Sequence, residues 1–322
     1  MNLSIIIVNY NTKDLVCQCL TSLERELKGT GYEYEVIIVD NASADGSQEM
    51  IKRHFPWAVL VENRVNIGFP KANNQVLMNC RGEFLFFLNP DTVVIPGSIT
   101  GMLDFLQNSP AYGAVGPKIT RPDGSIQLEC ASNFPDLWNM FCELTRLSRI
   151  FRQSPIFGRW RMTYWDHQDS RDVNCLLGAA IMMRRQIIDR IGPFDEHMYI
   201  EDVDLCYRIL QDGWKIRYLT AAEIVHYDGA SRKGSKRFYH HYQIAWTGLW
   251  YFFKKHKGPL QAMSFRLMTA IFSLLGLLLF SGAVLLSLFS GKRSDSFADK
   301  LQKSKAVFLW SITPAACLRS GY

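Results

Sequence analysis

The chain has 322 residues, 48% of them hydrophobic and 20% charged, and a formal net charge of +6. This composition is typical of a globular protein and excludes a disordered or collagen-like chain. The length allows one large domain or two small ones with an appendage. Much of the positive charge lies in residues 232–257 and 292–305. Such clusters favour a surface that faces anionic phosphates or lipid headgroups, and no nucleic-acid-binding module is visible.

The cysteines and the N-terminus indicate the compartment. Eight cysteines are scattered without C-x-x-C spacing, so we expect reduced, buried thiols in a cytosolic protein. Residues 1–11, MNLSIIIVNYN, lack a basic segment and have only a short apolar run. They predict a strand and not a signal peptide.

The first third of the chain alternates short apolar runs with amphipathic stretches. Strands are expected at residues 3–8, 35–40 and 59–62 and from residue 84, with helices ending near residues 27, 54 and 80. Thr12 is the expected N-cap of the first helix. This alternation predicts an α/β fold with a mostly parallel sheet and helices on both faces.

Polar residues follow each of these strands at its carboxyl end. They are Asn9 and Asn11, Asp40 and Asn41, Asn66 and Gly68, and Asp91. Because open α/β sheets bind ligands at this edge, the row predicts a nucleotide site. Asp40 is suited to accept from a ribose hydroxyl or a base N–H, and Gly68 permits close backbone approach. Taken one at a time, the same residues are ordinary helix caps and turn formers.

The stretch FLFFLNPDT at residues 84–92 predicts a buried strand that ends in a polar tip. Pro90 cannot donate to a sheet ladder, so pairing should stop there and leave Asp91 at the tip. The chain has no G-x-G-x-x-G and no P-loop motif. A divalent metal on Asp91, Mg²⁺ or Mn²⁺, is therefore the expected means of holding phosphates.

The middle of the chain is less regular. We expect a helix at 98–108, a strand at 114–119 and a hairpin turn at 121–124. Residues 130–172 are rich in aromatics without clear periodicity, which fits either a mobile flap over the site or a partner-facing surface. Residues 173–184 predict a strand with a small-residue kink at Gly178, where something bulky would lie against the backbone.

Two further segments contain candidate catalytic or metal-binding side chains. Glu201, Asp202 and Asp204 begin an amphipathic helix, where acids either stabilise the helix dipole or include a general base. Strands at 216–219 and 223–226 follow, and the second ends at His226, just before the basic loop containing Arg232. A single histidine is more often structural than a ligand.

Six motifs in this order resemble the family 2 inverting glycosyltransferases of the GT-A fold, in particular the bacterial O-antigen and cell-wall rhamnosyltransferases. They are IIIVNYN at 5–11, VDNAS at 39–43, NIGFPKANN at 66–74, LNPDT at 88–92, GAAIMMRR at 178–185 and FDEHMYIEDVDLCYR at 194–208. The resemblance covers residues 1–250.

The resemblance implies a role for each matching residue. The residues implied to line the base, ribose and donor are Asn9, Asn11, Asp40, Asn41, Asn66, Gly68, Asn73, Asn89, Gly178 and Arg232. Asp91 would bind the metal, with His226 as a further ligand. Asp202 would be the catalytic base, supported by Glu201. Asn89 departs from the family pattern, which often has Asp there, so the metal is expected to arrive with the nucleotide.

The implied function is transfer of a sugar, such as rhamnose, from a dTDP- or UDP-sugar to a hydroxyl of a lipid-linked saccharide. Two alternatives stay open. A processive polysaccharide synthase would carry a Q-x-x-R-W motif, which the stretch from Gln243 to Trp246 does not match. A catalytically impaired nucleotide-sugar binder acting as a membrane scaffold is suggested by Asn89. The sequence indicates no oligomeric state.

The C-terminal part predicts membrane association. Residues 239–253 indicate an amphipathic helix on the membrane surface, and residues 267–290 are uncharged and long enough to cross a bilayer. Residues 307–318 are too short for a full second span. We therefore expect a catalytic domain at 1–235, with halves 1–120 and 121–235, a surface helix at 236–265 and a membrane segment at 266–322. The catalytic domain is expected on the cytoplasmic side of the inner membrane, in contact with its lipids.

Overall fold

The fold is described from a computed structural model, and the described residues are 1–227, 235–289 and 295–313. The chain forms two compact units. The first contains Met1–Phe134, Trp160–His197 and Glu201–Ser231, and the second contains Pro135–Arg159, Met198–Ile200 and Arg232–Tyr322. Arg232, one of the expected binding residues, lies outside the described residues.

The first unit is built on a nine-stranded mixed sheet in the order β3-β2-β1-β4-β10-β6-β11-β5, with β8 paired to β11. Its strands are β1 Leu3–Asn9, β2 Tyr34–Asp40, β3 Val59–Glu62, β4 Phe84–Leu88, β5 Thr92–Val94, β6 Tyr112–Thr120, β8 Arg171–Asp172, β10 Ala180–Arg184 and β11 Lys215–His226. Strands β1 to β4 are parallel, as expected. Strands β1 and β4 are buried along their whole length, which explains their unbroken apolar sequences.

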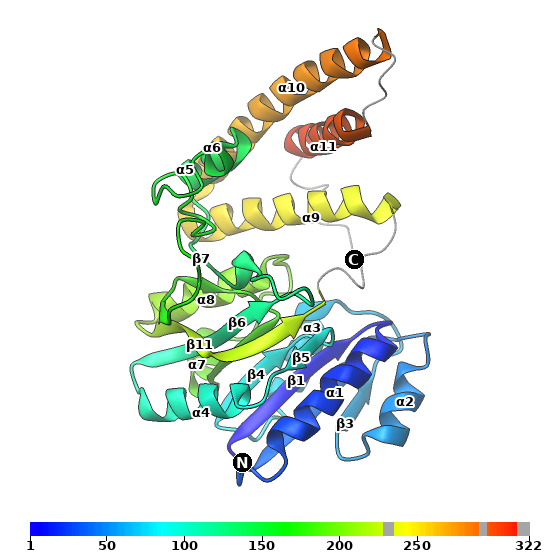
Figure 1. The fold of residues 1–322 in the computed structure, drawn as a ribbon, viewed down its shortest axis with the longest axis vertical. Coiled ribbons are helices and arrows are strands. Elements are labelled where there is room, and N and C mark those ends of the chain that lie inside the picture. The colour runs from blue at the N-terminus through cyan, green and yellow to red at the C-terminus, as the bar shows by residue number, and fades with distance from the viewer. Residues whose placement is uncertain (228–234, 290–294, 314–322) are drawn as a thin grey trace. The chain divides into compact units, whose positions relative to one another are not determined.

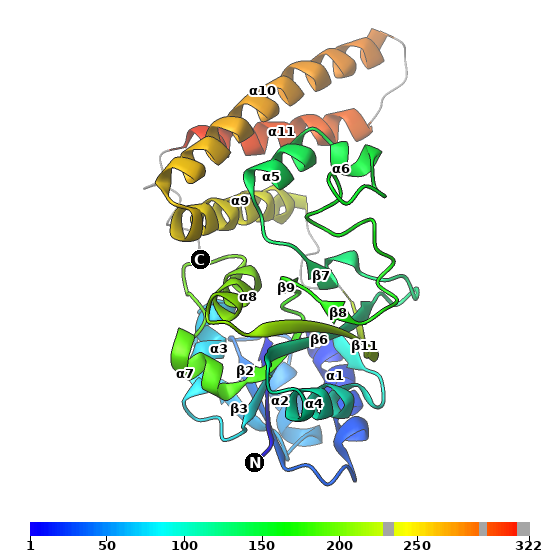
Figure 2. The same cartoon turned by 90° about the vertical axis from the view of Figure 1, so that its left-hand side faces the viewer.

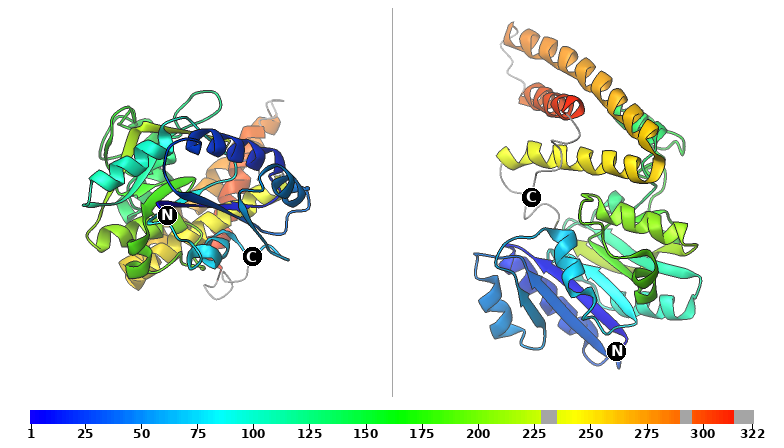
Figure 3. Two further views of the ribbon diagram at one scale, coloured as in Figure 1. Left: turned by 90° about the horizontal axis from the view of Figure 1, so that it is seen from below. Right: turned by 180° about the vertical axis from the view of Figure 1, so that it is seen from behind.

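Helices cover both faces of this sheet (Figures 1 and 3). They are α1 Lys13–Leu27, α2 Ser47–His54, α3 Phe69–Leu77, α4 Ser98–Asn108, α7 Arg185–Ile191 and α8 Glu201–Gln211. A short helix η1, Leu128–Cys130, and the strand pair β7 Ala131–Ser132 and β9 Cys175–Leu176 lie beside the sheet. Helix α3 ends at Leu77, slightly before the expected residue 80.

Three strands differ from the sequence prediction. The expected strand at 173–184 is interrupted, and its second part, β10, runs antiparallel to both β4 and β6. The two strands expected after residue 215 form the single strand β11, with an irregularity between Leu219 and Glu223. The three-residue strand β5 pairs antiparallel with the end of β11 and was not predicted. A segment that short carries no period-two signal of its own.

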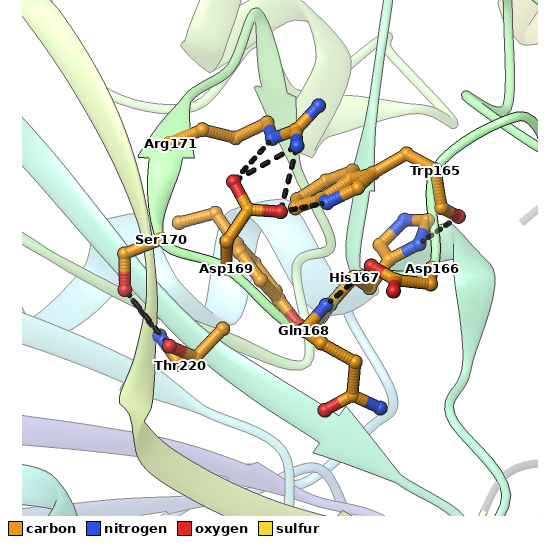
Figure 4. Close-up of polar contacts among 9 residues, drawn as sticks. Trp165, Asp166, His167, Gln168, Asp169, Ser170, Arg171 and Thr220 are labelled. Carbon is orange, nitrogen blue, oxygen red and sulfur yellow. Dashed lines mark hydrogen bonds and ion pairs between the residues drawn. The ribbon is translucent and has the colours of Figure 1, made fainter.

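Residues 160–172 of the aromatic insert pack onto β11 (Figure 4). The ring of Trp165 stacks on His167 at a centroid distance of 4.0 Å, and the Arg171 guanidinium lies 4.0 Å from the Trp165 ring centre. Asp169 accepts hydrogen bonds from Trp165 Nε1 and from Arg171. The Tyr218 hydroxyl of β11 donates to the carbonyl of His167. This part of the insert is therefore a packed structural element of the first unit.

The second unit contains residues 135–159 of the insert and the C-terminal helices. Its elements are α5 Leu137–Leu144, α6 Leu147–Ile150, α9 Ser235–Phe252, the π-helical turn η3 Phe253–Lys257, α10 Pro259–Phe289 and α11 Asp295–Ile312 (Figure 2). Trp246 of α9 contacts Phe265 of α10 and Trp310 of α11, so aromatic rings join these helices. Helices α5 and α6 were not predicted, because they have only eight and four residues and lie within an irregular aromatic stretch.

Helix α10 is the one helix among the described residues that is long and apolar enough to cross a membrane. The qualifying stretch is Pro259–Val284, with a mean hydropathy of 2.2. It overlaps the stretch 267–290 that the sequence indicated. Phe141 of α5 packs edge-on against Phe272 of α10, so part of the insert covers this helix.

Candidate active site

Asn9 and Asp40 lie side by side at the ends of β1 and β2, where they are paired in register. Both are fully buried. Asn9 Nδ2 donates to Asp40 Oδ2 at 2.7 Å, and Asn9 Oδ1 accepts from Thr12 Oγ1 at 2.6 Å. Thr12 stands at the N-cap position of α1, but its side chain makes no cap hydrogen bond. The predicted N-cap position of Thr12 is therefore confirmed, but its hydroxyl orients the Asn9 amide and does not cap the helix.

The Asp40 carboxylate also organises the loop that follows β2. Its Oδ1 accepts from the Ser43 backbone N–H at 2.9 Å and from Gln48 Nε2 at 2.6 Å. Asn11 joins the same loop, because its Oδ1 accepts from the Ala44 backbone N–H at 2.8 Å. Asp40 is thus engaged inside the protein, and direct contact between Asp40 and a ribose or base remains a prediction.

The residues that follow β2 and β3 are hydrogen-bonded to one another. Asn41 Nδ2 donates to the carbonyl of Gly68 at 3.4 Å, and Asn41 Oδ1 accepts from Asn63 Nδ2 at 2.9 Å. Asn66 is exposed and accepts from the Gly68 backbone N–H through its Oδ1. Gly68 has a φ of 88°, a conformation that favours glycine. Asn73 is buried in α3, and its Nδ2 donates to the carbonyl of Phe69.

Asp91 and His226 come together through the pairing of β5 with β11, which places Thr92 opposite His226. His226 Nε2 lies 3.2 Å from Asp91 Oδ1, and both residues are buried. The Tyr227 backbone N–H donates to the carbonyl of Asp91 at 2.9 Å, which holds the two strand ends in place. The two side chains predicted as metal ligands are therefore neighbours in space.

Gln127 contacts the ring nitrogen of His226 that does not face Asp91. His226 Nδ1 lies 2.9 Å from Gln127 Oε1, a buried acceptor, and can donate a hydrogen bond to it. A His226 ring that donates through Nδ1 would have Nε2 available to bind a cation together with the neighbouring Asp91 carboxylate. Among the described residues no group of three His, Cys, Asp or Glu side chains is placed to hold a metal. Two protein ligands fit Mg²⁺ or Mn²⁺, since such ions take their other ligands from water and phosphate.

The Asp202 side chain is hydrogen-bonded to the loop just before β10. Its Oδ2 accepts from the Gly178 backbone N–H at 2.9 Å, and its Oδ1 accepts from the Val203 N–H at 2.8 Å. A Cβ at position 178 would lie 3.2 Å from the Asp202 Cβ. The group that lies against the small-residue kink is thus the Asp202 carboxyl.

The same kink connects Asp202 to the tip of β4. The Asn89 backbone N–H donates to the carbonyl of Ala179 at 2.9 Å, directly beyond the β4–β10 ladder. The Asn89 carbonyl accepts from Thr92 Oγ1 at 2.7 Å, which fixes the turn carrying Asp91. Hydrogen bonds therefore tie the segments that carry Asp91 and Asp202 to one end of the same strand pair.

The acid pair at the start of α8 has perturbed pKa values. Burial and the neighbouring Asp202 charge raise the pKa of Glu201 to about 8, and burial raises the pKa of Asp202 above its ordinary value. The backbone donors of Gly178 and Val203 oppose the shift at Asp202. With a pKa of about 8, Glu201 keeps its proton near neutral pH. Asp204 is buried in an ion pair with Arg208 and belongs to the core.

The sequence did not predict the contacts that four residues make in this site: Thr12, Ser43, Asn63 and Gln127. Asn63 follows β3 directly, so its place at a strand tip was a usable signal. Gln127 follows the hairpin turn, and only the pairing of distant strands brings it to His226.

Comparisons with known proteins identify the family of this chain. Residues 4–192 match the model of glycosyl transferase family 2, and the chain therefore belongs to that family. It is 29% identical over 245 residues to an N-acetylglucosaminyl-diphospho-decaprenol L-rhamnosyltransferase of Mycobacterium tuberculosis, covering 71% of this chain and 77% of the relative. It is 26% identical over 242 residues to the O-antigen biosynthesis protein RfbC of Myxococcus xanthus, covering 71% of this chain and 18% of the relative.

Solved structures support the same fold. A mannosyltransferase of Pyrobaculum calidifontis in complex with GDP-Man and Mn²⁺ matches with a TM-score of 0.58 at 15% identity, covering 97% of this chain and 86% of the other. The S. aureus protein TarS, residues 1–349, matches with a TM-score of 0.50 at 17% identity, covering 97% and 81%. The expected GT-A fold and glycosyltransferase class are confirmed.

Proposed function

We propose that this glycosyltransferase moves a sugar, with inversion, from a dTDP- or UDP-sugar to a hydroxyl of a lipid-linked saccharide. The mycobacterial relative is named for a reaction on a diphospho-decaprenol saccharide, and rhamnose is therefore the first sugar to test. The proposal includes membrane attachment through the second unit, with the first unit on the cytoplasmic side of the inner membrane. The apolar helix α10 supports that attachment.

One observation carries the mechanistic part of the proposal. Asp202 is held against Gly178, and the neighbouring Ala179 is hydrogen-bonded to Asn89 two residues before Asp91. A carboxylate suited to take a proton is thereby anchored at the same strand end as the Asp91–His226 pair. Removing a proton and neutralising a leaving diphosphate are the two tasks of sugar transfer from a nucleotide donor.

Asp202 is the proposed general base. Two backbone N–H groups fix its carboxylate, and the raised pKa makes it a stronger proton acceptor than an ordinary aspartate. It takes the proton of the acceptor hydroxyl as the oxygen attacks the anomeric carbon. The nucleoside diphosphate leaves from the opposite face, so the configuration inverts. Protonated Glu201 adds no second negative charge beside the developing bond.

Asp91 and His226 would hold a divalent metal, and that metal supplies positive charge for the diphosphate when it is bound. Gln127 keeps His226 in the ligand tautomer. Asn9, Asn41 and Gly68 shape the strand tips where the nucleoside is proposed to bind. Asn89 contributes its backbone to the turn, so a neutral side chain here is compatible with an ordered Asp91.

The test measures nucleotide released from dTDP-rhamnose and from UDP-sugars with a polyprenyl-diphosphate saccharide, with and without EDTA. The anomeric configuration of the product is read by NMR. Asp202→Asn is expected to lower turnover about 100-fold or more while donor binding by calorimetry persists. The exposed acid variant Asp189→Asn is the matched control and should behave as the wild type. Near-normal turnover of Asp202→Asn would exclude Asp202 as the base.

The same assay separates the two alternatives. A catalytically impaired scaffold, suggested by Asn89, would bind donor and release no nucleotide in the presence of acceptor. A processive synthase would give products of many sugars, whereas the proposed enzyme adds one.

A further inference from the structure

The second unit contains a cavity with a volume of about 670 Å³ that the glycosyltransferase site does not use. Helices α5, α6, α9, α10 and α11 all contribute to its lining. Four cationic residues line it, and they are Arg146, Arg149, Lys300 and Lys303. The apolar part of the lining comes mainly from α10, with Phe272, Leu275, Leu279 and Phe280.

The cations of this cavity outnumber its acids, which are Glu143 and Asp299. Asp299 pairs with Lys303 at 2.7 Å. Arg146 and Lys300 approach one ring, that of Phe280, at 5.7 Å and 6.0 Å from its centroid. Within residues 1–227, 235–289 and 295–313, no ion pair joins a carboxylate to Arg146, Arg149 or Lys300. Converging cations without carboxylate partners are suited to bind an anion.

The apolar lining continues onto an exposed apolar face of α10. Leu267, Ile271, Leu274 and Leu278 are exposed by 43–66% and recur every three or four residues, so they lie on one face of the helix. Leu275 and Leu279 extend this face to the cavity. The opposite face carries buried Phe265, Thr269 and Ser273. A ligand that fits both parts must have a charged head and a long apolar chain.

We propose that this cavity binds the phosphate or diphosphate headgroup of a lipid, with the lipid chain lying along the exposed face of α10. Arg146, Arg149 and Lys300 contact the phosphate oxygens. Phe280 and Leu279 contact the first carbons of the chain. Two sources share this chemistry, an anionic phospholipid of the membrane and the polyprenyl diphosphate that carries the acceptor saccharide. The second source rests on the proposed function, whereas the first does not.

The depth of this cavity in the membrane follows from its charges. Lys300, Lys303 and Arg146 lie beside the apolar middle of α10, where a spanning helix would place them in hydrocarbon. Each such charge is unfavourable at the bilayer centre. The cations therefore lie at the level of the headgroups, and α10 lies along the membrane surface with its exposed leucines in the acyl region. This arrangement differs from the crossing helix that the sequence predicted.

The experiment measures binding of the full-length protein to phosphatidylcholine vesicles alone, with phosphatidylglycerol, and with undecaprenyl diphosphate. Tighter binding to either vesicle with net negative charge than to phosphatidylcholine alone is expected, and the preferred vesicle identifies the source. The variant Arg146→Gln/Lys300→Gln is expected to weaken that binding about 30-fold, because each cation near a charged membrane contributes about 1 kcal/mol. Lys305→Gln is the matched control, since exposed Lys305 is on α11 but outside the cavity.

Three results would overturn the proposal. They are equal binding by the double variant and the wild type, an equal loss in Lys305→Gln, and equal affinity for all three vesicles. If the double variant does not fold, Arg149→Gln replaces it, because Arg149 is exposed and lines the same cavity. Asp202→Asn should bind the vesicles as the wild type does. A failed lipid site and a failed transfer reaction are therefore distinguishable.

Discussion

The backbone N–H of Gly178 donates a 2.9 Å hydrogen bond to Asp202 Oδ2, and no side chain at position 178 fits without displacing that carboxyl. The contact joins the loop before β10 to the first turn of α8. It orients the proposed base and stabilises its charged form.

Replacing Gly178 with alanine should impair transfer without impairing donor binding. The added Cβ would lie 3.2 Å from Asp202 Cβ and 3.4 Å from Oδ2, so the carboxyl must move by a few tenths of an ångström. We expect turnover to fall about tenfold, because small displacements of a catalytic group are costly. Steady-state kinetics and donor calorimetry check this expectation. Gly101→Ala, where a Cβ meets nothing within 4 Å, is the control. Unchanged turnover in Gly178→Ala would show that the contact is not needed.

Replacing Gln127 with leucine should weaken metal binding. The change removes the acceptor for His226 Nδ1, so the histidine no longer presents Nε2 to Asp91 in one tautomer. Loss of such a supporting hydrogen bond lowers metal affinity about 10-fold or more. Titration with Mn²⁺ in the presence of nucleotide diphosphate measures it. Exposed Gln168→Leu should bind as the wild type does. Equal Mn²⁺ affinity in both variants would contradict this role for Gln127.

Replacing Glu201 with glutamine should flatten the pH dependence of stability. The Glu201 pKa rises from 4.5 to about 8 in the folded protein, so the folded state binds the proton more tightly than the unfolded state. The free energy of unfolding therefore falls as pH rises from about 4.5 to about 8, and it levels off above that. Urea unfolding across this range measures the slope. The exposed variant Glu24→Gln should keep the wild-type slope, and a Glu201→Gln variant that also keeps it would refute the assignment.

Replacing Thr12 with valine should destabilise the first unit. The Asn9 Oδ1 atom would lose its hydrogen bond inside a fully buried network, at a cost of about 1–3 kcal/mol. Thermal and urea unfolding measure this change. Thr21→Val, at an exposed position in the same helix, should change stability by much less. If Thr12 only began the helix, replacing it would change donor affinity little. Because Thr12 also orients Asn9, we expect the donor affinity of Thr12→Val to fall.

Much of the first unit was predictable because its signals are local. The apolar runs at β1, β2 and β4 and the polar residue after each strand predicted both the parallel sheet and the edge that carries the site. Asp91 at the end of β4 is such a local signal. The antiparallel β10, the short β5 and the continuity of β11 depend on pairing between segments far apart in the chain, which no local pattern encodes.

The sequence alone determined the residue types at each strand tip, the acid pair at the start of α8 and the apolar length of α10. The periodicity of hydrophobic residues and the turn-forming residues are sufficient to predict these features, because each depends on neighbours along the chain. Only the tertiary structure decided that Gln127 contacts His226 and that Thr12 donates a hydrogen bond to Asn9. It also decided that Arg146 and Lys300 both approach the ring of Phe280. Such contacts join residues on different elements, and their partners are chosen by how the sheet and helices pack.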